Sequence, residues 1–179
     1  MKTIDLHIID IVHNSIRAGA TQIEIGLQVY KMQNKIIVTI KDDGCGMNKS
    51  TLDAIKNSFF SSRKERKTGM GIALLEFHAK QAGGSFSIES EPGKGTIVKA
   101  EFQEDNVDRQ PLGDVPLCIA TFICQYDKIN FVFKYADDSN SFCISTNEVL
   151  EVFDGIDINN SNVIKSISEL IRQSLKYID

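Results

Sequence analysis

The chain has 179 residues, 42% of them hydrophobic, which is enough for one full core and a small second one. A formal net charge of −4 argues against general nucleic-acid binding, because that activity needs a basic surface. No apolar run approaches the roughly 20 residues of a membrane-spanning helix, the N-terminus lacks the plan of a signal peptide, and the four cysteines show no CxxC spacing. We therefore expect a reduced cytoplasmic protein that neither spans a membrane nor binds nucleic acid.

A helix is predicted over residues 3–18, because apolar residues recur there every three or four positions. Polar residues follow the same period on another side of this helix. They recur at spacings of three, four and three and so form one stripe: His7, Asp10, Asn14 and Arg17. The stripe brings a carboxylate, an amide and a guanidinium group into one line.

Two strands are predicted next, over residues 21–29, where apolar residues alternate, and over residues 35–41. The second strand leads into Asp42-Asp43-Gly44-Cys45-Gly46-Met47, which sets a carboxylate against two glycines. Glycines let a backbone come close to a ligand, and a carboxylate can accept a hydrogen bond from an amino group such as that of adenine. A short helix is predicted over residues 50–56.

Residues 57–68 are rich in basic side chains and are predicted to be mobile, because this polar stretch lies between two ordered elements. The segment Thr68-Gly69-Met70-Gly71-Ile72 then places two glycines just before a helix predicted over residues 71–82, in which His78 is expected to be a surface residue. A helix N-terminus presents unpaired N–H groups and a partial positive charge, so anions settle there. Together with the turn at 42–47, this helix start predicts one nucleotide site.

The rest of the chain divides at a charged segment, residues 104–114, which is predicted to be a linker. It separates a predicted domain over residues 1–103 from a C-terminal part over residues 115–179, for which no motif suggests a role. The elements predicted on either side are strands over 85–90, 96–102, 117–124, 129–135 and 141–144, a short helix opened by the capping-box pattern Ser145 to Glu148, and an amphipathic helix over 161–177.

The order of these motifs resembles the GHKL ATPase superfamily, which joins gyrase-type topoisomerases, heat-shock chaperones, histidine-kinase catalytic domains and mismatch-repair ATPases. The resemblance covers residues 1–103. The motifs that carry it are the polar helix stripe with Asn14, the DxGxG turn at 42–46, the GxG at 69–71 and the turn Gly93-Lys94-Gly95-Thr96. It implies an α/β two-layer sandwich, in which helices cover one face of a mixed sheet and ATP lies between helices and a lid. Residues 115–179 would add either an extension of that layer or a small α+β appendage.

The resemblance also implies roles for single residues. Asn14 would bind Mg²⁺, a hard ion that prefers oxygen ligands and bridges phosphates. Asp42 would accept the adenine amino hydrogen, with Thr96 close by. The other implied contacts are Gly44 and Gly46, which would make room for the base, Arg17, Gly69 and Gly71 at the phosphates, and Met47, Thr68 and Met70 around the nucleotide.

Position 10 bears on the mechanism. The resemblance implies that hydrolytic members, and serine kinases of the anti-sigma type, carry Glu four residues before the Mg²⁺ asparagine, whereas histidine kinases usually carry Asn. This chain has Asp10, about one helical turn from Asn14. Asp is one methylene shorter than Glu, and a displacement of ~1 Å can cost on the order of 10²-fold in rate. We expect slow hydrolysis or slow phosphotransfer, with a carboxylate that only tunes Asn14 or a water as the alternative.

The predicted function is that of a cytoplasmic, Mg²⁺-dependent ATP-binding regulatory protein. Slow hydrolysis of ATP to ADP would switch the lid over residues 57–68 and so control a partner protein. Two alternatives stay open, a serine/threonine protein kinase of the anti-sigma type and a non-catalytic nucleotide sensor. The choice between ATPase and protein kinase is left open by the sequence.

Overall fold

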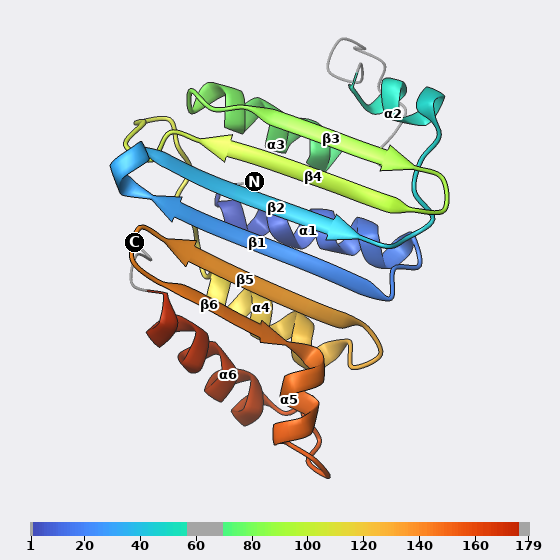
Figure 1. Cartoon of the computed structure of the whole chain (residues 1–179), viewed down its shortest axis with the longest axis vertical. Coiled ribbons are helices and arrows are strands. Elements are labelled where there is room, and N and C mark those ends of the chain that lie inside the picture. Colours follow the sequence, from blue (N-terminus) through green and yellow to red (C-terminus); the bar gives the residue numbers. More distant parts are fainter. Residues whose placement is uncertain (1, 57–69, 176–179) are drawn as a thin grey trace.

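The computed structural model describes residues 2–56 and 70–175. Its centre is one six-stranded sheet with the order β3-β4-β2-β1-β5-β6 (Figure 1). All neighbouring strands are antiparallel except β1 and β5, which are parallel. The strands are β1 (Gln22–Tyr30), β2 (Lys35–Asp42), β3 (Phe86–Glu91), β4 (Gly95–Phe102), β5 (Asn130–Asp137) and β6 (Ser141–Ser145).

Helices cover one face of this sheet. In Figure 1, α1, α3 and α4 lie together behind the strands, so the fold is an α/β two-layer sandwich, as the sequence predicted. The helices are α1 (Ile4–Arg17), α2 (Lys49–Lys56), α3 (Met70–Gln81), α4 (Val115–Gln125), α5 (Thr146–Val152) and α6 (Ser161–Ser174), with a short 3₁₀ turn, η1 (Lys31–Gln33), between β1 and β2. No helix within the described ranges has the length and apolar character needed to cross a bilayer.

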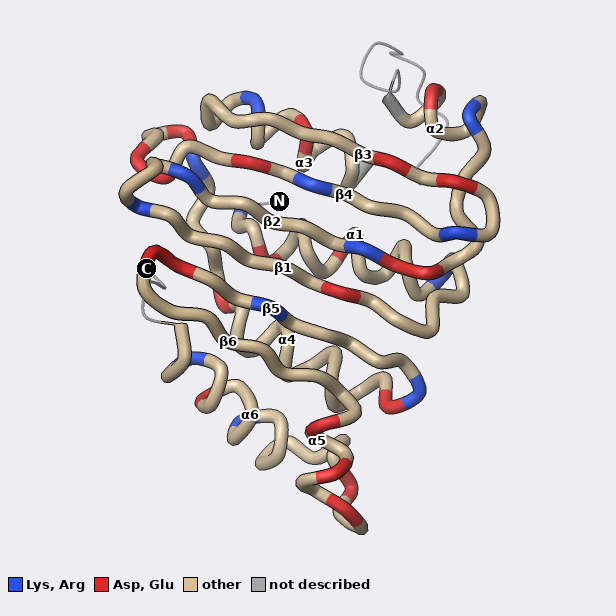
Figure 2. The backbone as a smooth tube through the Cα atoms, viewed as in Figure 1, with Lys and Arg blue, Asp and Glu red and all other residues tan. Residues whose placement is uncertain are grey.

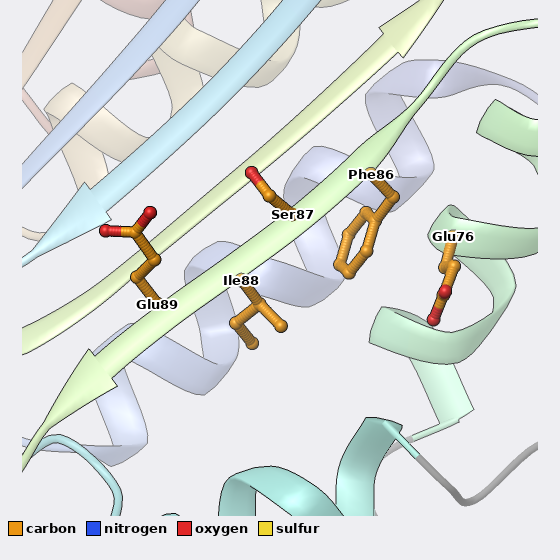
Figure 3. Close-up of a pocket in the computed structure, with 5 residues that line it drawn as sticks. All are labelled: Glu76, Phe86, Ser87, Ile88 and Glu89. Atoms are coloured by element: carbon orange, nitrogen blue, oxygen red, sulfur yellow. The ribbon is translucent and has the colours of Figure 1, made fainter.

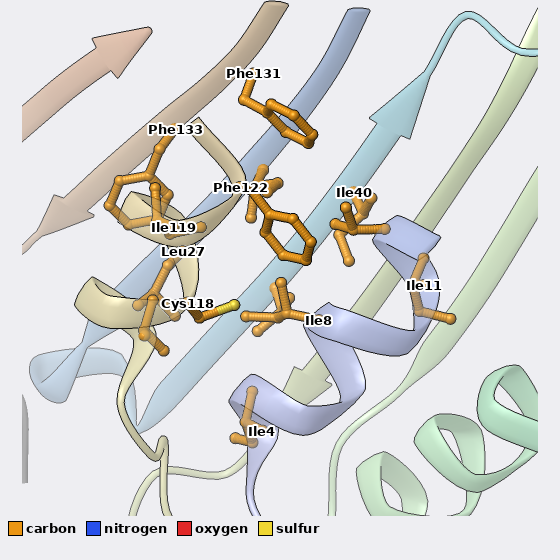
Figure 4. Packing of buried hydrophobic residues seen from close by; sticks show 14 of the residues in the cluster. Ile4, Ile8, Ile11, Leu27, Ile40, Cys118, Ile119, Phe122, Phe131 and Phe133 are labelled. Carbon is orange, nitrogen blue, oxygen red and sulfur yellow. The ribbon is translucent and has the colours of Figure 1, made fainter. Parts of the chain in front are cut away.

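The core lies between the helices and the sheet, and it follows from the alternation of apolar residues in the central strands. In β1, Ile23, Ile25 and Leu27 are fully buried, while the residues between them are partly exposed on the other face. Figure 4 shows Leu27 and Ile40 meeting side chains of α1 and α4, including Ile8 and Phe122. Because the two central strands bury this face, α1 is held across the middle of the sheet.

The opposite face of the sheet is polar. It carries ion pairs between neighbouring strands, including Lys134 with Glu24 at 2.7 Å and Lys35 with Glu101 at 3.4 Å. One buried face and one face with charged side chains are typical of an antiparallel sheet whose second face is exposed to solvent.

The prediction of a strand over residues 117–124 was wrong, because this segment is the helix α4. Asp114 is its N-cap, with Asp114 Oδ1 accepting a hydrogen bond from Leu117 N at 3.1 Å, and Pro116 lies in the first turn, where its missing N–H costs nothing. The segment is apolar on almost every side because α4 packs against both the sheet and α6. An apolar run of this kind does not separate a buried helix from a buried strand by periodicity.

The C-terminal strands extend the central sheet. β5 pairs in parallel with β1, with Ile25 opposite Phe133, and β6 forms the far edge. The predicted capping box is confirmed: Glu148 N donates to Ser145 Oγ at 3.3 Å, and Ser145 N donates to Glu148 Oε2 at 2.8 Å. Of the two placements that the sequence left open, the strands after the linker take the first, an extension of the same layer.

The segment 104–114 is attached to the start of α1. Ile4 N donates to Pro111 O and Asp5 N donates to Leu112 O, each at 2.9 Å. Leu112 is buried in the core. The segment that was expected to be a linker therefore supplies hydrogen-bond acceptors to the first turn of α1, which would otherwise have free N–H groups.

Candidate functional site

Asp42 is the last residue of β2, and its carboxylate is fixed from three directions. Asp42 Oδ1 accepts hydrogen bonds from Gly44 N at 3.0 Å and Thr96 N at 3.2 Å. Asp42 Oδ2 accepts one from Ser15 Oγ of α1 at 2.7 Å. The residue is only 8% exposed. A carboxylate held in this way is an oriented acceptor, because each oxygen has further capacity for a donor from a ligand.

The glycines of the turn at 42–47 are explained by close contact between two loops. Gly46 has a φ of +64°, and a Cβ at this position would overlap with the carbonyl oxygen of Glu91. Gly95 has a φ of +93°, and a Cβ there would overlap with the carbonyl oxygen of Asp42. Gly44 lies against Ala18, whose Cβ would be 2.9 Å from a Cβ at residue 44. These glycines let the turn at 91–95 and the end of α1 pack around Asp42.

Ser90 joins this turn to the strand that pairs with β2. Ser90 Oγ accepts a hydrogen bond from Met47 N at 2.8 Å and lies 2.9 Å from Thr96 Oγ1. It also donates to Gly95 O at 3.0 Å. Met47 and Thr96, two of the predicted site residues, are thereby linked through the hydroxyl of Ser90, to which the sequence assigned no role.

Asp43 fixes the other side of the turn. Asp43 Oδ1 accepts hydrogen bonds from Thr21 N at 2.8 Å and Gln22 N at 2.9 Å, and Asp43 Oδ2 accepts one from Thr21 Oγ1 at 2.7 Å. Loss of solvation acts to raise the pKa of Asp43, but the hydrogen bonds from Gln22 and Thr21 outweigh it and lower the pKa. Asp43 thus has a structural role, because its carboxylate holds the start of β1 beside the turn.

The polar stripe of α1 meets the N-terminal end of α3. A Cβ at residue 71 would overlap with Asp10 Oδ2, so the carboxylate of Asp10 lies directly against the backbone of Gly71. One turn further along α1, Asn14 Oδ1 lies 3.5 Å from Arg17 Nη1, and Arg17 is exposed. Asp10 therefore occupies the end of α3 at which unpaired N–H groups and the helix dipole favour negative charge.

Two of the predicted site residues lie outside the part of the chain that the structure describes. Thr68 and Gly69 lie outside the described residues, as does the predicted mobile stretch 57–68. Met70 is the first residue of α3.

His7 belongs to the same stripe of polar residues on α1, but it is buried. It is 1% exposed, and its Nε2 lies 3.1 Å from His78 Nδ1 and 3.0 Å from Gln110 Oε1. His78, which was expected to be a surface residue, is partly exposed, and its Nδ1 contacts His7 of α1. Burial lowers the pKa of His7 to about 4, with repulsion from His78 adding to the effect while the hydrogen bond to Gln110 opposes it. The stripe therefore changes character along α1, from a buried contact at His7 to the partly exposed Asp10 and Asn14.

Two hollows are lined by residues outside this constellation. One lies beside the edge strand β3, where Phe86 and Ile88 face Glu76 of α3 (Figure 3). The other lies at the opposite end of β2 from Asp42, around Lys35, Gly84 and Glu101. Neither hollow includes a described residue that the sequence assigned to the nucleotide site.

Helix α1 connects the two described parts of the candidate site, the turn at Asp42 and the start of α3. This helix contacts the end of β2 through Ser15 and the start of α3 through Asp10. Ser15 was not predicted to take part. Its signal in the sequence is its phase, since it follows Asn14 by one residue and lies on the side of α1 that is buried with Ile8, Ile11 and Val12.

Comparisons with known proteins identify the family of the region that contains these residues. Residues 3–106 match the family model described as histidine kinase-, DNA gyrase B-, and HSP90-like ATPase. A putative sensor protein of Shewanella frigidimarina (strain NCIMB 400) is 34% identical over 97 residues, which cover 53% of this chain and 15% of that protein. Sporulation kinase C of Bacillus subtilis (strain 168) is 33% identical over 91 residues, which cover 51% of this chain and 21% of that protein. The matched region is thus a small part of both relatives.

Among solved structures, the crystal structure of the N-terminal domain of a DNA repair protein superposes on this chain with a TM-score of 0.58. The match has 17% sequence identity and covers 87% of this chain and 58% of that chain, so it concerns the fold alone. The family model, by contrast, covers more than half of the chain and spans α1, the Asp42 turn and α3. The chain therefore belongs to the histidine kinase-, DNA gyrase B- and HSP90-like (GHKL) ATPase family, whose domains bind ATP.

Proposed function

We propose that this protein is a Mg²⁺-dependent ATP-binding regulatory protein that hydrolyses ATP slowly and acts on a partner protein. The observation that carries the proposal is the double contact of α1, in which Ser15 holds the carboxylate of Asp42 and Asp10 lies against Gly71. One rigid helix thus links a fixed acceptor suited to an adenine amino group with a helix start suited to phosphate.

The residues present fit an adenine nucleotide and a magnesium ion. Asp42 is a buried carboxylate with both oxygens oriented by donors, so it would accept the amino hydrogen of adenine without rearranging. Asn14 would hold Mg²⁺ through its amide oxygen, and the exposed Arg17 beside it would contact phosphate. Bound ATP supplies the phosphoanhydride bond that is broken.

Asp10 is the proposed base. Its carboxylate would take a proton from the attacking water at one of its oxygens, while the N–H groups at the start of α3 would stabilise negative charge on the transferred phosphoryl group. The carboxylate of Asp10 lies beside Gly71 at the start of this helix, so it would lie next to a phosphate group bound there. We expect turnover that is slow and is limited by the position of this carboxylate.

The test is calorimetry with ATP, in magnesium and in chelator, combined with measurement of phosphate release. Asp10→Asn should abolish phosphate release while leaving ATP affinity nearly intact. Asp42→Asn should lower ATP affinity at least about tenfold, because the amide cannot offer the same pair of acceptors. Asp127→Asn, an exposed acid in the turn before β5, is the matched control and should change neither quantity. Absence of any magnesium-dependent heat at millimolar ATP would contradict the proposal.

Two other outcomes distinguish the alternatives. The same carboxylate could deprotonate a serine or threonine hydroxyl, in which case label from the γ-phosphate would appear on such a residue of a co-purifying protein. A nucleotide sensor would bind ATP tightly without turnover, and Asp10→Asn would have no effect. The lid over residues 57–68, with its basic run at 63–67, stays a prediction from the sequence. Equal hydrogen exchange of residues 58–68 with ADP and with a non-hydrolysable ATP analogue would contradict a switch there.

A further inference from the structure

The excess negative charge of this chain is concentrated in one short segment. The chain has 24 acidic and 20 basic residues, and the four acidic residues between positions 146 and 164, a stretch without Lys or Arg, account for the whole difference. They recur every three residues: Glu148, Glu151, Asp154 and Asp157. Figure 2 shows this acidic segment on α5 and the turn after it, beyond β6 and at the opposite edge of the sheet from β3.

Large apolar side chains are exposed within the same segment. Val152 is 78% exposed, Ile156 57% and Leu150 37%. Single exposed apolar residues are common on protein surfaces, but three within seven residues, interleaved with carboxylates, are not accounted for by the fold. We define residues 148–157 as the acidic–apolar knob.

The knob is anchored rather than loosely attached. Thr146 is fully buried, and its Oγ1 accepts a hydrogen bond from Phe131 N at 3.1 Å. Val149 and Ile158, on either side of the exposed residues, are buried in the core. The capping box fixes the first turn of α5. The exposed apolar side chains are therefore presented by a backbone that the core holds in place, which lowers the entropic cost of docking.

We propose that the acidic–apolar knob is the docking site for a partner protein that presents a basic amphipathic segment. Lysine and arginine side chains of such a segment would complement the four carboxylates, and its apolar side chains would cover Val152 and Ile156. The sign of the charge disfavours anionic membranes and nucleic acids, which the knob would repel. This inference is independent of the nucleotide site, since the knob lies outside residues 3–106 that match the ATPase family.

The test uses the full chain, isotopically labelled for NMR, and a designed helical peptide with lysines on one face and leucines on the other. Resonances of residues 148–157 should shift on titration. Val152→Ser/Ile156→Ser should weaken binding about tenfold, and so should Glu151→Gln/Asp154→Asn/Asp157→Asn. Glu148 is left unchanged because it completes the capping box. Both variants should retain the dispersed spectrum and the ATP affinity of the parent protein.

A matched control is available at Val107, which is 98% exposed and lies next to an exposed acid, Asp108, in the segment 104–114. Val107→Ser/Asp108→Asn removes the same kinds of groups and should leave peptide affinity unchanged. A peptide in which every leucine is replaced by serine should bind much more weakly than the amphipathic one, because the apolar contacts are lost.

Several results would overturn the proposal. These are shifts that map to other residues, equal loss of affinity in the Val107 control, and equal binding of the leucine-free peptide. Sedimentation that shows self-association dependent on Val152 would make a second copy the occupant instead. Flotation of the chain with vesicles of phosphatidylcholine and phosphatidylglycerol, lost in the Val152→Ser/Ile156→Ser variant, would make a membrane the occupant.

Discussion

The hydroxyl of Ser15 donates a hydrogen bond to the carboxylate of Asp42 over 2.7 Å, and this bond joins α1 to the end of β2. Both residues are buried, so no solvent replaces the bond if it is lost. Ser15 contacts no ligand in the proposed mechanism. It positions the residue that does.

The first prediction concerns this bond. Ser15→Ala should lower ATP affinity by roughly tenfold to a hundredfold, because hydrogen bonds to charged groups contribute about 1.5–3 kcal/mol and Asp42 would lose one of its three fixed donors. Calorimetry with ATP measures the affinity, and urea unfolding measures the accompanying loss of stability. Ser15→Thr, which keeps the hydroxyl, should recover part of the affinity.

Ser166 provides the control for this prediction. Ser166 Oγ donates a hydrogen bond to Asn162 O one turn earlier in its helix, at 2.9 Å, and Ser15 Oγ likewise lies 3.3 Å from Ile11 O while its hydrogen is donated to Asp42. Ser166→Ala removes that bond in α6, which packs against α4, whereas Asp42 lies at the end of β2. This variant should leave ATP affinity unchanged. If Ser15→Ala also left it unchanged, Asp42 would not depend on α1 for its orientation.

The second prediction concerns the contact between Asp10 and Gly71. Gly71→Ala should destabilise the protein by about 1–3 kcal/mol, even though alanine favours a helix, because its Cβ would overlap with the carboxylate of Asp10. Phosphate release should fall as Asp10 is displaced. The double variant Gly71→Ala/Asp10→Ala should recover much of the lost stability but no activity.

Gly26 provides the control for the substitution of Gly71 by alanine. A Cβ at Gly26 would lie 3.6 Å from Thr39 Cβ, which is ordinary contact, so Gly26→Ala should be close to neutral. Equal destabilisation by Gly71→Ala in the presence and absence of the Asp10 side chain would mean that the two residues do not interact.

The sequence predicted the sheet well where one face of a strand is buried. The alternation in β1 identifies its inward residues, and the capping box at Ser145 marks the start of α5, because both signals depend on neighbouring residues alone. It failed at α4, where burial on nearly all sides removes the period that distinguishes a helix from a strand.

The candidate site was predictable only where it depends on residues that are neighbours along one helix. The phase of α1 placed Asp10 and Asn14 together, but it gave no indication that His7, on the same stripe, is buried. That burial depends on Gln110, more than a hundred residues later, and on His78 of α3. The partners of Ser15 and Ser90 are likewise set by tertiary packing rather than by local spacing.

The third prediction concerns pH. The pKa of His7 is about 4 in the folded protein and 6.5 for the unperturbed side chain, so between these values the unfolded chain binds a proton that the folded chain excludes. The free energy of unfolding should therefore fall as the pH drops from about 6.5 towards about 4, by roughly 2–3 kcal/mol at the lower end. The pKa of His78 is also lowered, first by burial, and adds to the loss.

Urea unfolding of the parent protein and of His7→Gln at a series of pH values checks this expectation. The difference in unfolding free energy between the two should change with pH below about 6.5 and be constant above it. A constant difference over the whole range would mean that His7 is solvated in the folded protein or accepts a proton there without cost.

The last prediction concerns Asp114, which links two helices of the C-terminal part. Asp114 Oδ1 accepts hydrogen bonds from Leu117 N at 3.1 Å, as the N-cap of α4, and from Arg172 Nη2 of α6 at 2.8 Å. Asp114→Ala should lower the free energy of unfolding by about 0.5–2 kcal/mol through loss of the cap. Asp114→Asn should retain most of this stability, since Asn is an equally good N-cap, and Arg172→Ala should cost less than about 1 kcal/mol because this ion pair is exposed. If Asp114→Asn were as destabilising as Asp114→Ala, the ion pair and not the cap would be the stabilising contact, and added salt should then remove the difference between Asp114→Asn and the parent protein.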